Sequence, residues 1–197
     1  MNSIVLSDAA LATIFTEAHT FYSWQEREVS DETLEQIYHL AKMGPTAMNC
    51  GPLRVIFVKG KKAKEKLKPS LDVGNVEKTM AAPVTAIFAY DLKFYENLSK
   101  LFPVVNTAGW FSEGSPNTQE VAFRNGTLQA AYFMVAARAV GLDCGPMSGF
   151  NQQAVNETFF SHTTWKSNFL CNLGYGRPES FHPRLPRLEF ATVCIIK

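Results

Sequence analysis

Segments that favour strands and segments that favour helices follow one another irregularly along this chain, and this order constrains the fold most. Two short runs rich in β-branched and aromatic residues, Leu53 to Lys59 and Val84 to Tyr90, are typical of strands. The lysine-rich stretch between them, KGKKAKEKLK, predicts a short exposed helix with a solvated face. A helical apolar spacing from about Gln119 to Val140 predicts the longest helix. Because regular strand–helix–strand spacing is absent, the α+β class is favoured.

Shorter signals mark the remaining elements. Ser7 and Ser30 can each accept a hydrogen bond from the first turn of a helix. Gly44 and Pro45 then end the second of these helices. The other predictions are a tight Gly/Pro segment over 144–150, a short helix over 152–160, and strands over 169–173 and 191–196.

Length and composition limit the kinds of protein that this chain can form. Its 197 residues fit one domain, so we expect a single domain over residues 1–197. A formal net charge of +1 argues against a nucleic-acid partner, which normally meets a strongly basic face. The N-terminal stretch MNSIVLSDAALATIF has no basic start and no clean cleavage signal. No run approaches the roughly 18 apolar residues that span a bilayer, so we expect a cytoplasmic protein without a membrane partner.

Several kinds of chemistry lack their usual sequence signal. The cysteines Cys50, Cys144, Cys171 and Cys194 form no CxxC pair, so we expect thiols and no metal site. The chain also lacks GxGxxG, a P-loop, HExxH and GxSxG. A cysteine hydrolase that uses Cys50 with His39 stays open as an alternative.

Four segments place glycine or proline beside polar groups. The first closes a helix before a strand, and the second puts Asn75 and Lys78 on one face if it is helical. The third can expose backbone N–H groups, and the fourth carries two guanidinium groups that suit a phosphate. Taken singly, each of these segments is more often a plain turn or cap. The segments are 44–52, 74–78, 145–149 and 184–187.

These four segments and two further ones together resemble the motifs of a known family. The chain is similar to the FMN-dependent nitroreductases, and more narrowly to the branch that contains the malonic-semialdehyde reductase of pyrimidine breakdown. The resemblance extends from about Leu11 to Phe190. It rests on six ordered segments: GPTAMNC, GNVEKT, FRNGTLQAAY, GLDCGPMSGF, KSNFLCNLGYG and RLPRL.

The resemblance implies a nitroreductase-like α+β fold with a central mixed or antiparallel sheet flanked by helices. It also implies an interlocked homodimer with one FMN in each of two interface sites, and NADH or NADPH as the hydride donor. Arg184 and Thr20 are then expected to contact the FMN phosphate, with the backbone around His19 nearby. Asn75 and Lys78 are expected at the pyrimidine edge of the flavin.

The same resemblance assigns the rest of the flavin site. Backbone N–H groups in the segment Pro146, Met147, Ser148 and Gly149 are expected to face N5 and O4 of the flavin. Pro45, Thr46 and Asn49 are expected to come from the partner subunit and cover the cofactor.

Lys78 and Arg184 each have a plainer interpretation beside the functional one. Lys78 would stabilise the negative charge that two-electron reduction leaves near N1 and O2 of the flavin. On spacing alone, however, Lys78 is a surface lysine. Arg184 can equally form an exposed salt bridge, and Arg187 can simply brace its loop.

Two positions depart from the family pattern. The family often begins this motif with an arginine, whereas Ala18 stands at the matching position here, so phosphate affinity should depend more on Arg184. Gly51 replaces the glutamine that usually follows the covering asparagine, so no contact is transferred to Gly51.

The implied reaction is a ping-pong cycle in which NAD(P)H reduces FMN, leaves, and is replaced by a small-molecule acceptor. No side chain is assigned as a certain catalytic group, because N5 of the flavin carries the hydride and Lys78 tunes it. The branch suggests malonic semialdehyde, reduced to 3-hydroxypropionate, with Arg124 as a candidate for its carboxylate. The alternatives are a broad nitro- or quinone reductase, a flavin-binding sensor or carrier, and an interaction module that binds no flavin.

A long segment before the longest helix is a further candidate for the site. The stretch from Phe102 to Thr118 is rich in Gly, Pro, Asn and Ser, and predicts a loop. Trp110 and Phe111 within it are candidates for a mobile lid that excludes solvent.

Overall fold

The computed structural model describes residues 5–197, so residues 1–4 of the expected domain lie outside the described residues. A four-stranded sheet forms its centre, in the order β1-β2-β4-β3, and every neighbouring pair of strands is antiparallel. The predicted α+β class is confirmed. The strands are β1 (Leu53–Lys59), β2 (Val84–Asp91), β3 (Asp143–Met147) and β4 (Trp165–Gly174).

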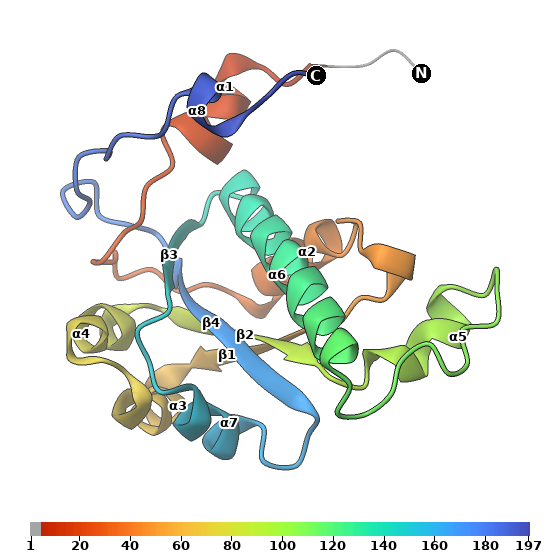
Figure 1. Ribbon diagram of the computed structural model, residues 1–197. Helices are drawn as coiled ribbons and strands as arrows, with labels where there is room; N and C mark the ends of the chain where they lie inside the picture. The colour runs from red at the N-terminus through yellow and green to blue at the C-terminus, as the bar shows by residue number, and fades with distance from the viewer. Residues whose placement is uncertain (1–4) are drawn as a thin grey trace.

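Strand β2 explains why helices cover both faces of the sheet. All of its residues are buried, and successive side chains of a strand point to opposite faces. Phe88 packs in a core cluster with Ile37 and Phe133 on one face, whereas Ile87 packs with Leu67 on the other. Helices α2 and α6 therefore cover the first face, and α3, α4 and α7 lie on the opposite side (Figure 1).

The helices follow the local signals in the sequence. Ser7 and Ser30 both accept a hydrogen bond from the first helical turn, as predicted. The longest helix begins at Pro116, a residue whose fixed φ suits the first turn. The α-helices are α1 (Asp8–Leu11), α2 (Asp31–Ala41), α3 (Gly60–Leu67), α4 (Val73–Ala81), α5 (Leu98–Leu101), α6 (Pro116–Ala139), α7 (Gln152–Phe159) and α8 (Phe190–Val193). The π-helix Ala12–Thr16 and the 3₁₀ turns Ala47–Asn49, Lys68–Ser70 and Phe94–Asn97 complete the set.

Three sequence-based predictions were wrong. The segment 144–150 was expected to form a tight turn, but residues 143–147 pair with β4, and Pro146 is tolerated because β3 is at the end of the sheet order. The strand predicted over 191–196 is absent, because Phe190–Val193 forms a helical turn instead. The lysine-rich helix is not wholly solvated, because Lys64 is only 3% exposed.

The two terminal segments stand apart from the body. Figure 1 shows α1 and α8 at a distance from the sheet. The segments meet where Arg184 Nη2 donates hydrogen bonds to the carbonyl oxygens of Thr16 and Ala18, at 2.6 and 2.9 Å. Within residues 5–197, no helix combines the length and apolar character needed to cross a bilayer.

Candidate functional site

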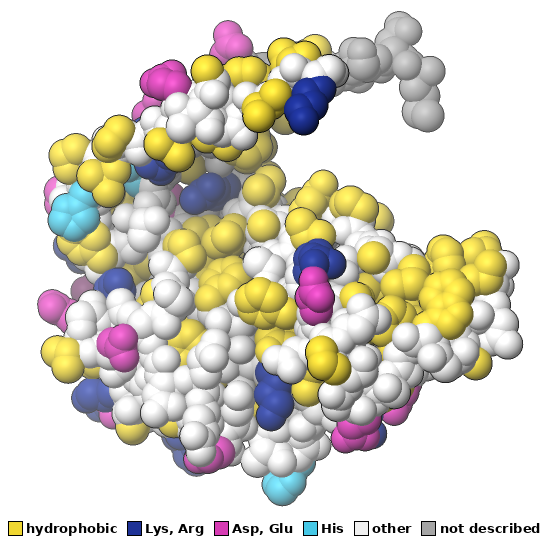
Figure 2. All heavy atoms as spheres, viewed as in Figure 1, with side chains coloured by type: hydrophobic (Ala, Val, Ile, Leu, Met, Phe, Trp, Pro, Cys, Tyr) yellow, Lys and Arg dark blue, Asp and Glu magenta, His cyan; other side chains and the backbone are white. Residues whose placement is uncertain are grey.

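A cavity of about 930 Å³ lies between the terminal segments and the body of the molecule. Figure 2 shows the surface deeply hollowed below the terminal segments. Its walls come from residues 15–23, the helix α4, the end of α6, the strand β3 and residues 182–187. Five residues assigned to the flavin by resemblance line this cavity: His19, Thr20, Lys78, Pro146 and Arg184.

The backbone explains why residues far apart in sequence meet in this cavity. Thr20 forms a parallel β-bridge with Cys144, which holds the segment around His19 beside β3. Lys78 approaches from the last turn of α4, and Arg184 arrives with the C-terminal segment. Arg187, whose role the sequence left open, also lines the cavity.

The cavity carries an excess of positive charge. Lys78, Arg138, Arg184 and Arg187 line it, whereas Glu77 is the acidic residue in its described wall. Guanidinium groups present planar sets of donors that match phosphate oxygens. The cavity therefore suits an anionic ligand.

The residues expected around the flavin ring are divided between the wall of this cavity and segments that do not line it. Gly74 and Pro146 line it, whereas Asn75, Met147, Ser148 and Gly149 are not among its lining residues. The Nδ2 group of Asn75 donates to the carbonyl oxygen of Gly149 at 2.7 Å, which joins α4 to the segment after β3.

Gly149 is required by this close approach. A Cβ atom at this position would lie 2.5 Å from Nδ2 of Asn75 and 2.9 Å from Oδ2 of Asp72. The backbone N–H of Asp72 also donates to the Gly149 carbonyl, at 3.1 Å. Only a residue without a Cβ leaves the Asn75 amide in its present place.

Two buried side chains donate hydrogen bonds to the backbone of Lys78. Its carbonyl oxygen accepts hydrogen bonds from Nε1 of Trp24 at 3.1 Å and from Nδ2 of Asn172 at 3.3 Å. The last carbonyls of a helix have no partner within the helix, so these donors satisfy a group that burial would otherwise leave unpaired. The position of Lys78 is thereby fixed at its main chain, while its side chain faces the cavity.

Lys64 extends this polar network into the interior. Its Nζ donates to Oγ1 of Thr85 at 2.5 Å and to the carbonyl oxygen of Thr79 at 2.8 Å. Oγ1 of Thr85 donates in turn to Oδ1 of Asn172 at 2.6 Å. Burial lowers the pKa of Lys64 from 10.5 to about 7, because the charged form loses its hydration.

Pro45, Thr46 and Asn49, the residues expected to cover the cofactor, do not line this cavity. Their loop is held by other contacts, because the Ala47 N–H donates to Oδ1 of Asn125 at 2.8 Å. Nδ2 of Asn49 donates to the carbonyl oxygen of Leu101 at 2.9 Å. The expected site is therefore divided between two separate regions of the chain.

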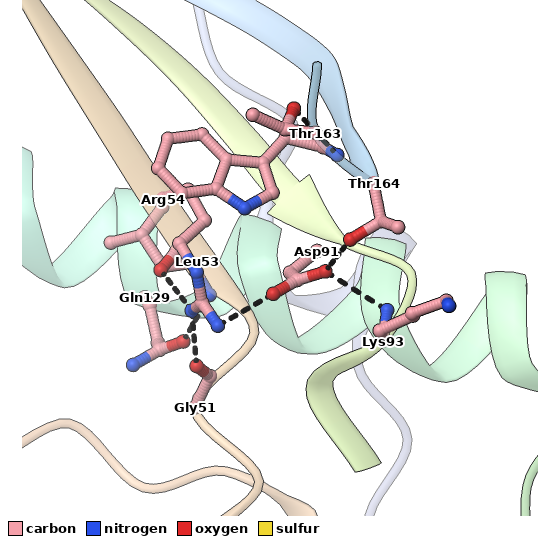
Figure 3. A network of polar contacts seen from close by, with 9 residues as sticks. Gly51, Leu53, Arg54, Asp91, Lys93, Gln129, Thr163 and Thr164 are labelled. Carbon is pink, nitrogen blue, oxygen red and sulfur yellow. Dashed lines mark hydrogen bonds and ion pairs between the residues drawn. The ribbon is translucent and has the colours of Figure 1, made fainter. Parts of the chain in front are cut away.

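An ion pair fixes the point where this loop enters β1 (Figure 3). Nη2 of Arg54 lies 2.7 Å from Oδ2 of Asp91, and Nη1 of Arg54 donates to the Gly51 carbonyl at 3.1 Å. The other carboxylate oxygen of Asp91 accepts from Oγ1 of Thr164 and from the Lys93 N–H. Both ends of the ion pair are largely shielded from water, so solvent screens it only partly.

The segment proposed as a lid lies with this loop and does not line the cavity. Phe111 packs in a cluster with Met48 and Phe94, and Trp110 is about half exposed. Arg124, the candidate for a substrate carboxylate, is exposed on α6 and contacts Glu120. Neither Trp110 nor Arg124 is among the residues that line the cavity within one chain.

The alternative cysteine nucleophile has an unsuitable environment. Cys50 is buried, and burial raises the pKa of its thiol, which suppresses the reactive thiolate. His39 is exposed on α2, where its ring is tilted against that of Tyr38. The structure therefore does not favour a cysteine hydrolase.

Sequence reasoning missed Arg138 and Lys64. Arg138 lies in the segment predicted only as the longest helix, and Lys64 lies in a helix predicted only to be solvated. No local pattern marks either residue, because each gains its role from segments distant in sequence.

Comparison with known proteins identifies the family. The model of the nitroreductase family matches residues 17–175. A candidate nitroreductase from Bacillus subtilis superposes with a TM-score of 0.84 at 20% identity, covering 97% of this chain and 100% of that protein.

Two further solved structures share the fold. A protein from Exiguobacterium sibiricum, crystallised in complex with FMN, gives a TM-score of 0.82 at 18% identity over 100% of both chains. A candidate NAD(P)H:FMN oxidoreductase from Staphylococcus epidermidis gives 0.81 at 18% identity, again over 100% of both chains. At these identities the structural likeness establishes the fold.

Proposed function

The chain belongs to the nitroreductase family, and from that premise we propose that it is a single-domain, FMN-dependent NAD(P)H oxidoreductase. The observation that carries the proposal is the cation-rich cavity that gathers His19, Thr20, Lys78 and Arg184. Similarity to the FMN complex from Exiguobacterium sibiricum and to the candidate oxidoreductase from Staphylococcus epidermidis supports it.

The residues of the cavity fit FMN by their chemistry. Arg184 and Thr20 supply a cation and a hydroxyl donor for the phosphate, and Lys78 supplies a cation for the flavin ring. A Cβ at Gly145 would lie 2.9 Å from the Phe21 carbonyl, so the cavity wall needs a glycine there. FMN bound in this cavity would supply hydride transfer between the nicotinamide and the acceptor.

The side chains would contribute orientation and charge to this reaction. Trp24 and Asn172 hold the main chain of Lys78 through its carbonyl, and its ammonium group would stabilise negative charge on the reduced ring. Asn75, tied to Gly149, would hold an amide beside the same ring. No side-chain nucleophile is needed.

We propose that the active form is an interlocked homodimer. The loop of Pro45, Thr46 and Asn49 lies outside the cavity, so a second chain would have to supply it. Large apolar side chains are also exposed where a second copy would cover them. They are Phe15, Leu185, Leu188, Phe190, Val193, Ile195 and Ile196 on the terminal segments, and Phe123, Leu128 and Tyr132 on α6.

For the acceptor, we propose malonic semialdehyde on the basis of the sequence resemblance. Arg124 could contact its carboxylate only in an assembly, because it does not line the cavity of its own chain. The family as a whole favours the second candidate, a nitro- or quinone reductase. A flavin-binding sensor or carrier is the non-catalytic alternative.

The first experiment follows the visible absorption of the purified protein with FMN under anaerobic conditions while NADH or NADPH is added. Bleaching that reverses with malonic semialdehyde, or with a nitroaromatic or quinone, would support an oxidoreductase and rank the acceptors. A flavin that stays oxidised would point to a carrier, and a protein that binds no FMN would contradict the proposal.

A pair of variants tests the assigned charge. We expect Lys78→Met to slow flavin reduction by roughly 10-fold or more, because it removes a cation from the reduced ring. Lys62→Met, at an exposed lysine on α3, is the matched control and should leave the rate unchanged.

A further inference from the structure

Arg138 has more unused hydrogen-bonding capacity than the other arginines that line the cavity. Its Nε is buried and has no hydrogen-bond partner among the described residues. Its Nη1 donates to the carbonyl oxygen of Ile14 at 3.3 Å. A guanidinium group carries five N–H donors, so the edge formed by Nε and Nη2 is left without an acceptor in residues 5–197.

The neighbouring arginines are already engaged with backbone carbonyls. Arg184 donates to Thr16 and Ala18, and Arg187 donates to Leu185 and Pro186. These bonds shape the terminal segments that close the cavity. Arg138 instead approaches from the last turn of α6.

No acidic partner neutralises Arg138 within the described part of the chain. Asp143 is close enough for the charge of Arg138 to oppose the rise that burial causes in the pKa of Asp143. However, Oδ2 of Asp143 accepts from the Gly176 N–H at 2.8 Å, and the ion pairs of residues 5–197 do not include Arg138. The buried Nε has no acceptor and no acidic partner offsets the charge, so an anion bound beside this guanidinium group would be stabilising.

We propose that Arg138 is a phosphate-binding residue of this cavity, and that the Nη2 group of its guanidinium donates a hydrogen bond to an oxygen of the FMN phosphate. This inference rests on the proposed flavin site. A hydrogen bond between a guanidinium and a phosphate is charge-assisted, and is roughly twice as strong as one between neutral groups. Arg138 thereby supplies, from α6, a cation for the phosphate in a chain whose position 18 is an alanine.

The test compares two ligands that differ only in the phosphate, FMN and riboflavin. Flavin is removed from the full-length protein, and the Kd for each ligand is measured from the quenching of flavin fluorescence. For Arg138→Met we expect the Kd for FMN to rise roughly 10- to 100-fold, the usual effect of one lost hydrogen bond to a charged group. The Kd for riboflavin should stay unchanged.

Two further variants make the result specific. Arg138→Lys should give an intermediate loss for FMN, because an ammonium group keeps the charge but does not reproduce the reach and planar donor geometry of the guanidinium. Arg27→Met removes an exposed arginine that stacks on Tyr175 outside the cavity, and should change neither Kd. If Arg138→Met does not fold, as judged by its thermal unfolding, Arg138→Lys decides the question.

The outcomes separate this inference from the proposed function. A wild-type protein that binds FMN and riboflavin equally well would overturn the phosphate contact and leave the flavin site standing. An equal loss of both ligands in Arg138→Met would show that Arg138 only braces the segment around Ile14. A wild-type protein that binds neither flavin would remove the proposed function itself.

Discussion

Replacing Lys64 with methionine should change how the stability of the protein depends on pH. The pKa of Lys64 is lowered from 10.5 to about 7 by burial. Below pH 7 the lysine is charged in both states, so the folded protein bears the full cost of burying the charge. Between pH 7 and 10.5 only the unfolded chain keeps the proton, and the free energy of unfolding therefore increases with pH.

The size of the effect follows from the pKa difference. A shift from 10.5 to about 7 corresponds to about 5 kcal/mol over the whole window, and to about 2 kcal/mol between pH 7 and 9. Other titrating groups contribute equally to the wild type and the variant. The free energy of unfolding of the wild type, minus that of Lys64→Met, should therefore increase by about 2 kcal/mol between pH 7 and 9.

The assay is denaturant unfolding of the flavin-free protein at pH 7, 8 and 9, for the wild type and Lys64→Met. Lys62→Met, on the same helix but exposed, should follow the wild type at every pH. Methionine leaves the Thr79 carbonyl and Thr85 without their donor, so its stability should be lower at all three values. If the wild type and Lys64→Met show the same change with pH, Lys64 is not the buried titrating group.

Three other changes test the site, the loop and the assembly. Gly149→Ala should weaken FMN binding roughly 10-fold in a fluorescence titration, because the new Cβ displaces the Asn75 amide; an unchanged Kd would contradict the role of Asn75. Arg54→Met should lower the free energy of unfolding by about 2 kcal/mol, because it leaves the shielded Asp91 carboxylate without its cation. Denaturant unfolding measures this change, with Arg27→Met as the control variant. Equal stability of Arg54→Met and the wild type would argue against the role of the ion pair. Phe123→Lys should shift the protein from dimer to monomer in sedimentation analysis, and a wild type that is already monomeric would refute the proposed assembly.

Local chemistry made much of the fold predictable. The run from Leu53 to Lys59 has the bounds of β1, because an unbroken series of β-branched and aromatic residues, 55–58, forms its centre. Ser30 begins α2 because its hydroxyl accepts from a first-turn N–H, as its place in the sequence indicates.

The errors in the fold arose where pairing outweighs local preference. Strand β3 contains Gly145 and Pro146, residues that indicate a turn, but β4 supplies partners along its length. The segment 191–196 has the composition of a strand, but among the described residues it pairs with no strand of the sheet. Its apolar side chains remain exposed in the single chain.

Only those residues of the candidate site that belong to a recognisable sequence motif could be predicted. Five expected residues meet in one cavity, although each motif taken alone indicates an ordinary turn. Arg138 and Lys64 could not be identified, because their environments are built from Ile14, Thr79 and Thr85, which are distant in sequence. Burial and an unpaired donor become visible only in three dimensions.

The cavity is closed by contacts between the two terminal segments, and this affects the order of events in the cell. Arg184 and Thr16, which Arg184 holds, are 168 positions apart. Because β4 ends at Gly174 and pairs with both β2 and β3, the sheet and this end of the cavity can both be completed only when nearly the whole chain has been synthesised. A nucleotide bound in the cavity would contact both terminal segments at once. Binding of the ligand would therefore be the last step of maturation, and would protect both segments from proteases.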